Sequence, residues 1–372
     1  MRQWMILIVL LLLTMTAFAQ DDNAQEITQF RGGPAHIGTY SSDALIETPD
    51  LLWEFPSDRP VRTSLAIEDG LVYGGNESGT LYAVDIDTGK EVWQFDTDQP
   101  IVSTPALADG LIYFGGLDHN VYALDAATGK ERWRFETSNQ VYSSPTVVDD
   151  VVYIASLDGN LYALKMDTGD ELWRFKMAAD SWSSAAVVDG VVYIGSRDSK
   201  IYALESATGR ELWQFTTQSR VDASPAVVDD RVYIGSQDGF LYALNAETGQ
   251  EHWRFEVGSP IFASVAVADN RIYINGLDGI LFALSAEDGA VQWQFEMGKP
   301  AYSSPSYADG VIYAVTEYQG LLYALDAETG EELWTYTTGE QFDYRSSSPV
   351  LLNGNLYVGS NNRGFLALTP PK

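Results

Sequence analysis

The chain has 372 residues, and 45% of them are hydrophobic, which is enough to form a large buried core. Acidic residues outnumber basic residues 52 to 22, and the net charge of −30 argues against nucleic acids and anionic membrane surfaces as partners. Because the chain has no cysteine and three histidines, disulfides, thiolate metal sites and cysteine nucleophiles are excluded, and the histidines are too few for a histidine-rich metal site.

The N-terminal segment has the features of a secretory signal peptide. Arg2 supplies a positive charge, residues 5–13 form an unbroken apolar run, and Ala17-Phe18-Ala19 is a small-x-small cleavage site. The apolar run is too short to span a bilayer as a stable helix. We therefore expect a periplasmic or extracellular protein with a cleaved signal peptide over residues 1–19 and no membrane anchor. An uncleaved N-terminal anchor is the alternative.

After a lead-in assigned to residues 20–50, residues 51–372 are dominated by an internal repeat. Tryptophans recur six times at a spacing of 40 residues and once at 41. The series comprises Trp53, Trp93, Trp133, Trp173, Trp213, Trp253, Trp293 and Trp334. Recurrence at a fixed period of this length is typical of propellers and other repeat proteins.

Each period predicts four short strands. In the third period these cover residues 143–148, 151–155, 160–164 and 171–175. Asp, Thr and Gly residues separate them, and Gly supplies the positive φ that tight turns need. Four strands in about forty residues have the size of one blade of a β-propeller.

The ends of the repeat domain predict how the ring closes. Eight copies of the first three strands are present, and the last copy, residues 347–368, ends before a tryptophan strand. The tryptophan strand over residues 51–55 has no strands before it. We therefore predict an all-β, eight-bladed propeller in which the N-terminal strand completes the last blade and leaves no open sheet edge at the seam.

One segment of the repeat resembles the tryptophan-docking motif of the quinoprotein (PQQ-like) propeller superfamily. The pattern Ala-x-Asp-x-x-Thr-Gly-Lys-x-x-Trp is intact at residues 83–93 and 123–133. The resemblance covers residues 44–369 and implies that all eight tryptophans of the series dock between neighbouring blades. Looser docking is expected in the copies with substitutions in the motif. These substitutions are Lys165, Glu205, Asn245 and Ser285 for Asp, and Asp288 for Thr.

Within this superfamily, the chain is most similar to a non-enzymatic branch. That branch includes the propeller subunit of the outer-membrane β-barrel assembly machinery, which is a lipoprotein, whereas this chain lacks the lipid-bearing cysteine. The stretch Phe30-Arg31-Gly32-Gly33-Pro34 also looks like the N-terminal lead-in of the superfamily.

The variable positions of the repeat indicate where a binding site would lie. We call the end of the ring that carries the blade-to-blade connections and the second hairpins the upper face. The opposite end, with the first hairpins and the Thr-Gly turns, is the lower face. One position in each repeat lies where the chain enters the innermost strand from the upper face, two residues before a repeated Ser or Thr. Together these positions form a column of mostly large residues. Its candidate binding residues, the binding ring, are Arg62, Tyr142, Trp182, Asp222, Phe262, Tyr302 and Arg345. The alternative is that these side chains only pack the channel.

Catalytic and metal sites are not predicted. His36, His119 and His252 fall in different regions, so a Ser-His-Asp group is not expected. The acidic residues of the lower hairpins and turns are interpreted as a solvated face that keeps the protein soluble, with divalent-cation binding as the alternative.

The favoured function is a non-catalytic scaffold that binds a protein partner in the cell envelope without a cofactor, and we expect it to be monomeric. The resemblance implies outer-membrane protein assembly as the process. One alternative is a glycan or small ligand stacked on Tyr142, Trp182, Phe262 and Tyr302 at the channel mouth. The other is a PQQ-dependent dehydrogenase in which Trp182 stacks on the quinone and Asp222 is the base. The chain lacks that enzyme group's adjacent-cysteine disulfide and its recognisable calcium ligands.

Overall fold

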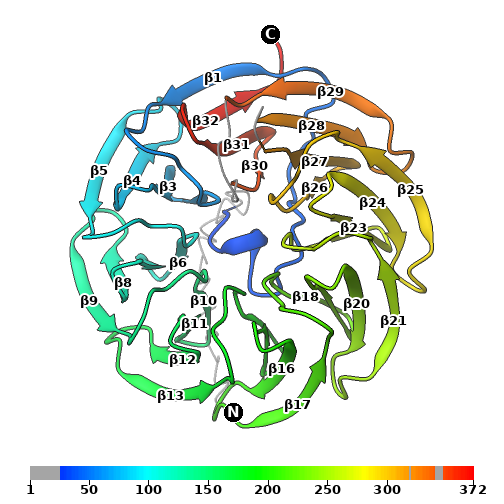
Figure 1. Cartoon of the computed structure of the whole chain (residues 1–372). Helices are drawn as coiled ribbons and strands as arrows, with labels where there is room; N and C mark the ends of the chain where they lie inside the picture. The colour runs from blue at the N-terminus through cyan, green and yellow to red at the C-terminus, as the bar shows by residue number, and fades with distance from the viewer. Residues whose placement is uncertain (1–25, 318–319, 340–346) are drawn as a thin grey trace, which may run out of the picture.

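The computed structural model describes residues 26–317, 320–339 and 347–372, and it confirms the predicted eight-bladed propeller. Eight antiparallel sheets of four strands each are arranged in a ring around a central axis (Figure 1). The predicted signal peptide and Arg345 of the binding ring lie outside the described residues. Among the described residues, no helix is long and apolar enough to cross a membrane.

The strands occupy four positions from the axis outward. The innermost strands are β2 (Ala66–Glu68), β6 (Ala106–Ala108), β10 (Thr146–Val148), β14 (Ala186–Val188), β18 (Ala226–Val228), β22 (Ala266–Ala268), β26 (Ser306–Ala308) and β30 (Val350–Leu352). The second strands are β3 (Leu71–Gly75), β7 (Leu111–Gly115), β11 (Val151–Ala155), β15 (Val191–Gly195), β19 (Arg231–Gly235), β23 (Arg271–Asn275), β27 (Val311–Val315) and β31 (Asn355–Ser360). The third strands are β4 (Thr80–Asp85), β8 (Asn120–Asp125), β12 (Asn160–Lys165), β16 (Lys200–Glu205), β20 (Phe240–Asn245), β24 (Ile280–Ser285), β28 (Leu321–Asp326) and β32 (Gly364–Thr369). The outermost strands are β5 (Glu91–Asp96), β9 (Glu131–Glu136), β13 (Glu171–Lys176), β17 (Glu211–Thr216), β21 (Glu251–Glu256), β25 (Val291–Glu296), β29 (Glu332–Thr337) and β1 (Asp50–Phe55).

The innermost strands are shorter than predicted, and a side chain explains why. β10 begins at Thr146, whereas the sequence predicted a strand from residue 143. The Ser143 hydroxyl accepts a hydrogen bond from the Ala155 backbone N–H and donates one to the Ala155 carbonyl, both at 2.9 Å. This side chain replaces the ladder hydrogen bonds that a longer strand would make, so the backbone before Thr146 is free to turn upward to the mouth of the channel.

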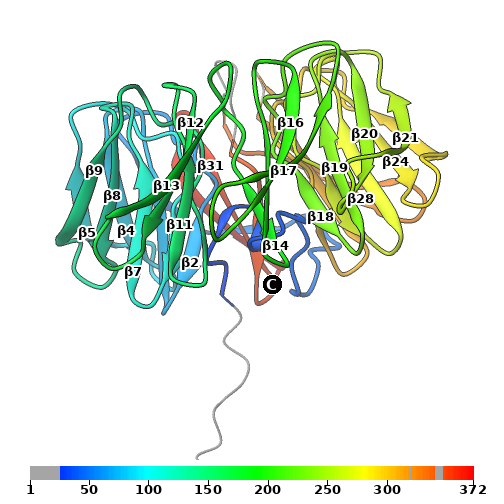
Figure 2. The ribbon, with the colours of Figure 1, turned by 90° about the horizontal axis from the view of Figure 1, so that it is seen from below.

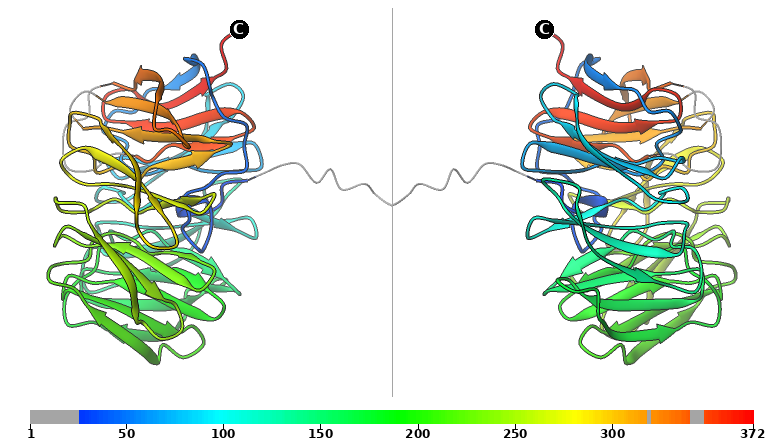
Figure 3. Two further views of the ribbon diagram at one scale, coloured as in Figure 1. Left: turned by 90° about the vertical axis from the view of Figure 1, so that its right-hand side faces the viewer. Right: turned by 90° about the vertical axis from the view of Figure 1, so that its left-hand side faces the viewer.

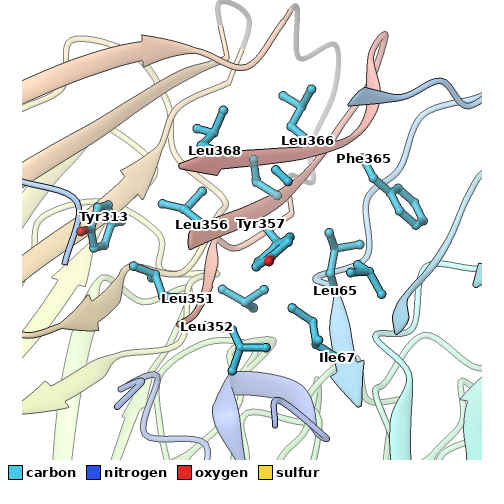
Figure 4. Packing of buried hydrophobic residues seen from close by; sticks show 14 of the residues in the cluster. Leu65, Ile67, Tyr313, Leu351, Leu352, Leu356, Tyr357, Phe365, Leu366 and Leu368 are labelled. Atoms are coloured by element: carbon cyan, nitrogen blue, oxygen red, sulfur yellow. The ribbon is translucent and has the colours of Figure 1, made fainter. Parts of the chain in front are cut away.

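The predicted closure of the ring by the N-terminal strand is confirmed. β1 pairs antiparallel with β32, with Trp53 opposite Ala367 and Phe55 opposite Phe365. The closing blade, blade 8, therefore joins β30, β31 and β32 from the C-terminal end with β1 from the N-terminal region. Its leucines pack against Leu65 and Ile67 of blade 1 and against Tyr313 of blade 7 (Figure 4).

Every tryptophan of the series docks on the neighbouring blade. Each indole Nε1 donates to a backbone carbonyl at 2.7–3.2 Å. For example, Trp93 donates to Ala126 at 2.8 Å and lies over Gly129, where a Cβ atom would be only 2.6 Å from the indole. Blade 8 has no Thr-Gly turn, and Leu45 of the lead-in supplies the carbonyl for Trp334 instead. The lead-in thus replaces the missing turn.

The expectation of looser docking at most of the altered motifs is wrong. Glu205 and Asn245 accept the hydrogen bond of the turn threonine in place of Asp. The indoles that dock on the turns after Lys165, Glu205 and Asn245 donate at 2.8–2.9 Å. Each indole docks on the turn of the following blade, so Asp288 lies in the turn that receives Trp253 and not in one that receives Trp293.

The turn that contains Asp288 receives Trp253, whose hydrogen bond to Ala286 is 3.2 Å long. We therefore expect Trp93→Ala to lower the free energy of unfolding by about 3–5 kcal/mol, as for other buried aromatic residues. Trp253→Ala should lower it by less, with a difference below about 1 kcal/mol, because the hydrogen bond that it removes is longer. Urea unfolding of the two variants measures the difference, and an equal or reversed ranking would contradict this interpretation.

The lead-in closes the lower mouth of the channel. It contains the short 3₁₀ helix η1 (Phe30–Gly32), which lies at the centre of the ring in Figure 1, and Figures 2 and 3 show the dark-blue lead-in at one end of the ring. Backbone N–H groups of seven innermost strands donate to lead-in oxygen atoms. The donors are Ile67, Leu107, Val147, Val187, Val227, Val267 and Tyr307, and the acceptors are Ile27, Thr28, the Gln29 side chain, Pro34, Ala35, Ile37 and Gly38, respectively.

Two ionisable side chains of the lead-in are buried in this plug. Arg31 is 2% exposed and donates from Nη2 to the Val265 carbonyl at 2.6 Å. The His36 ring is fully buried, and its Nε2 atom lies 3.1 Å from the Thr146 hydroxyl. Burial, together with the nearby charge of Arg31, lowers the pKa of His36 to about 3. His36 is therefore neutral in the folded protein at neutral pH.

Candidate functional site

The upper mouth of the channel contains a cavity of about 650 Å³. The structure brings together all six described members of the binding ring in its wall. These are Arg62, Tyr142, Trp182, Asp222, Phe262 and Tyr302. Each one lies in the connection that enters an innermost strand, so each blade contributes one position. Phe30 of the lead-in lines the same cavity from the lower side and forms its floor.

A circle of eight hydroxyl groups, the hydroxyl ring, lies one step deeper than the binding ring. Its members are Ser64, Thr104, Ser144, Ser184, Ser224, Ser264, Ser304 and Ser348, and all of them line the cavity. The backbone N–H of each donates to the hydroxyl of the next blade at 2.8–3.1 Å. The bond from Ser348 to Ser64 closes the circle. The repeated Ser or Thr that marks the column therefore connects neighbouring blades.

The polar side of the cavity lies on blades 4 and 5. The Arg197 guanidinium carbon is 3.7 Å from the centre of the Trp182 ring, which is cation–π contact. Trp182 in turn stacks on Tyr142, with ring centres 5.4 Å apart and planes 15° apart. Arg197 also donates from Nε to Asp222 at 2.9 Å and pairs with Asp180 at 3.2 Å. These contacts hold the Trp182 ring in a fixed orientation.

Asp222 is a buried, fully engaged carboxylate. Its side chain is 2% exposed, and its two oxygens accept hydrogen bonds from Arg197 and Gln237. Burial raises the pKa of Asp222, while the charge and hydrogen bond of Arg197 act in the opposite direction. Because both oxygens are already occupied, the arrangement orients Arg197 and Gln237 and does not present a free base.

The rest of the wall includes a second aromatic pair and a second ion pair. Phe262 and Tyr302 pack with ring centres 5.0 Å apart. Arg62 pairs with Glu77 at 2.7 Å. Glu77 and Asp222 are the two carboxylates that line the cavity among the described residues, and each is bound to an arginine. This donor set does not fit a quinone with a calcium ion, which needs carboxylate oxygens that are free to bind the metal.

A second polar column of the cavity was not predicted from the sequence. The first residue of the turn in each second hairpin varies between blades in the same way as the binding ring. It is Glu77, Leu117, Leu157, Arg197, Gln237, Leu277 and Glu317 in blades 1 to 7. Leu is the common residue, and three of its replacements, Glu77, Arg197 and Gln237, line the cavity. The replacement of Leu by polar residues at this position could therefore have identified these cavity residues from the sequence.

The structure keeps the three histidines apart. His36 lies in the lower plug, His119 in the second hairpin of blade 2, and His252 on the exposed outer strand β21. Within residues 26–317, 320–339 and 347–372, no cluster of three or more His, Cys, Asp or Glu side chains could hold a metal ion.

Solved structures with the same fold include proteins of different activities. BamB from Moraxella catarrhalis matches with a TM-score of 0.75 and 20% identity, over 87% of this chain and 98% of that chain. The quinohemoprotein alcohol dehydrogenase from Comamonas testosteroni matches with a TM-score of 0.79 and 16% identity, over 95% and 82%. The computationally designed Ika8 protein matches with a TM-score of 0.77 and 17% identity, over 87% and 100%. At these identities, the similarities establish the fold alone.

The sequence comparisons are more specific. No curated protein matches the chain. The profile of one family, described as outer membrane protein assembly factor BamB, matches residues 44–123, 111–220 and 197–370, and thus nearly the whole propeller. The chain therefore belongs to this BamB-like family of the PQQ-like propeller superfamily.

Proposed function

We propose that this protein is a non-catalytic scaffold of the cell envelope that binds a partner protein at its upper mouth. The observation that carries the proposal is the difference between the two ends of the ring. The lower mouth is filled by the lead-in, which makes hydrogen bonds to seven innermost strands. The upper mouth is hollow and lined by large side chains that differ from blade to blade.

The residues at the upper mouth are of the types that supply most of the binding energy at protein interfaces. Trp, Tyr and Arg side chains are enriched among residues whose truncation weakens binding strongly. Trp182, Tyr302 and Arg62 are such residues, and each is partly exposed in the cavity wall. Membership of the BamB-like family supports an envelope partner, and outer-membrane protein assembly is the process we propose.

The absence of catalysis is part of the proposal. The dehydrogenases among the structural neighbours share the fold at 15–16% identity. In this chain the residue considered as a base, Asp222, is held by Arg197 and Gln237. A scaffold needs a rigid mouth of this kind, because an ordered surface loses little conformational entropy when a partner binds.

Replacement of Trp182 and Tyr302 by Ala should abolish partner capture. Both side chains are partly exposed, so the melting temperature of the double variant should stay within about 3 °C of the parent. The measurement is affinity capture from envelope extract, with partners of the parent and the variant quantified by mass spectrometry and melting followed by circular dichroism.

The matched control changes the lower face. Asp149→Asn with Asp189→Asn removes two charges at first hairpins whose φ of 49° asparagine also tolerates. Capture should be unchanged in this control. If the control loses the partner and the aromatic variant keeps it, the acidic lower face is the binding surface and the proposal is wrong.

A further inference from the structure

We infer that the upper cavity is also a binding site for a neutral, polyhydroxylated small molecule, either a free sugar or the end of a glycan chain. The ligand would lie on Phe30 and inside the hydroxyl ring. This inference concerns the interior of the cavity and does not rest on the binding of a protein at the mouth.

The hydroxyl ring provides the hydrogen-bonding capacity. Each hydroxyl oxygen accepts one backbone N–H from the neighbouring blade, as described above. None of the eight hydroxyls donates a hydrogen bond to an acceptor within the described part of the chain. Each hydroxyl has one donor and two lone pairs, so eight O–H donors and eight lone pairs remain available in residues that line the cavity.

The charges favour a neutral ligand over an anion. Three arginines line the cavity, Arg62, Arg197 and Arg220. Glu77 pairs with Arg62, Asp180 and Asp222 pair with Arg197, and Arg220 lies close enough to Asp222 to affect its pKa, so three positive and three negative charges largely cancel. The net charge of −30 also repels an approaching anion. A sugar hydroxyl both donates and accepts hydrogen bonds. The hydroxyl ring can also do both, because each of its hydroxyls keeps one O–H donor and one lone pair.

The shape and the apolar surfaces favour a ring-shaped molecule over a single ion. The eight hydroxyls surround a cavity of about 650 Å³, which lies within the usual range of about 300–1,000 Å³ for small-molecule pockets. Phe30 forms the floor, and the Tyr142–Trp182 and Phe262–Tyr302 pairs form two walls. The C–H faces of a sugar ring can pack on these aromatic surfaces while its hydroxyls reach the hydroxyl ring.

Isothermal titration calorimetry of the purified protein tests the inference. The probes are glycerol, myo-inositol, glucose, N-acetylglucosamine, trehalose and maltotriose, with inorganic phosphate as the anionic comparison. We expect at least one sugar to bind and phosphate not to bind. Tighter binding of maltotriose than of glucose indicates the end of a glycan chain, and the reverse order indicates a free monosaccharide. If no probe binds, or if phosphate alone binds, the inference is wrong.

Two variants locate the site. Phe30→Leu removes the aromatic floor and keeps an apolar side chain, and should weaken binding of the sugar about tenfold. Ser224→Thr with Ser264→Thr keeps both hydroxyls, as Thr104 does naturally, but adds two methyl groups to the cavity wall. It should also weaken binding about tenfold, with an unchanged melting temperature.

The lower-face control, Asp149→Asn with Asp189→Asn, should bind the sugar as the parent does. Sugar binding that is unaffected by both cavity variants would place the ligand elsewhere and overturn the inference. The titrations use no partner protein. The absence of sugar binding therefore does not contradict the proposed protein partner, and the absence of partner capture does not contradict the sugar site.

Discussion

Deletion of residues 26–56 is expected to unfold the propeller and not to leave a smaller, stable ring. The deletion removes β1, which pairs with β32 from Asp50 to Phe55 and contributes the buried Trp53 and Phe55 to the core of the closing blade. It also removes the Leu45 carbonyl that accepts the hydrogen bond of Trp334. Blade 8 would then expose the whole edge of β32, and we expect aggregation without a cooperative thermal transition.

A circular permutant separates the role of the strand from that of the lead-in. In the parent, Asp50 lies opposite Thr369, so a short linker after Lys372 can connect the C-terminus to a transplanted copy of β1. This permutant should recover a cooperative transition and a monomeric state, at a lower temperature because the lead-in is missing. Light scattering and circular dichroism measure both properties. A truncated protein that stays monomeric and melts at the parent temperature would show that closure by β1 is not required.

Acidification below pH 6.5 is expected to destabilise the protein through His36. The pKa of His36 is about 3 in the folded state and about 6.5 in the unfolded chain, so only the unfolded chain takes up a proton between these values. The stabilisation from the neutral ring is therefore complete above pH 6.5 and is lost as the pH falls towards 3. The total effect is about 5 kcal/mol, at about 1.4 kcal/mol for each pH unit.

His36→Asn isolates this contribution, because asparagine tolerates the φ of 57° at this position and has no proton to gain. The difference in unfolding free energy between parent and variant, from urea titrations at pH 6.5, 5 and 4, should shift in favour of the variant as the pH falls. The comparison is needed because Glu68, whose pKa burial and nearby carboxylates raise to about 7, acts in the opposite direction. His252→Asn on the exposed strand β21 is the matched control. A parallel pH dependence of parent and His36→Asn would contradict the prediction.

The fold could be predicted from the sequence because its determinants recur. An eight-bladed ring explains three features of the sequence at once. These are the Trp spacing, the Asp and Gly turns, and the missing strands at the two ends of the repeat. The docking partner of Trp253 could not be predicted from the motif. The motif contains a turn and a tryptophan of the same repeat, and it does not show that the tryptophan docks on a different turn. In space, Trp253 contacts the turn of the following repeat, which is the turn that contains Asp288.

The candidate site was predictable in outline and not in its details. Six residues of the irregular column lie in one cavity wall, and their role in binding stays a prediction. The role of the lead-in as a plug was not visible, because its bonds to the innermost strands come mostly from backbone carbonyls, which any sequence provides. The pairing of Arg197 with Asp222 depends on two different connections that meet at the mouth, so no local spacing shows it.

The hydroxyl ring also affects how the protein can come apart. A linear array of repeats has two terminal units, and unfolding can begin at either one. Here the chain of hydrogen bonds from Ser64 through Ser348 returns to its starting point, so every blade has two neighbours and none is terminal. The one discontinuity is covalent and lies in blade 8, where β1 and β32 come from opposite ends of the sequence. Unfolding must therefore begin with separation of β1 from β32 or with the loss of two blade boundaries at once. We expect slow, all-or-none unfolding as a result of this circular connectivity.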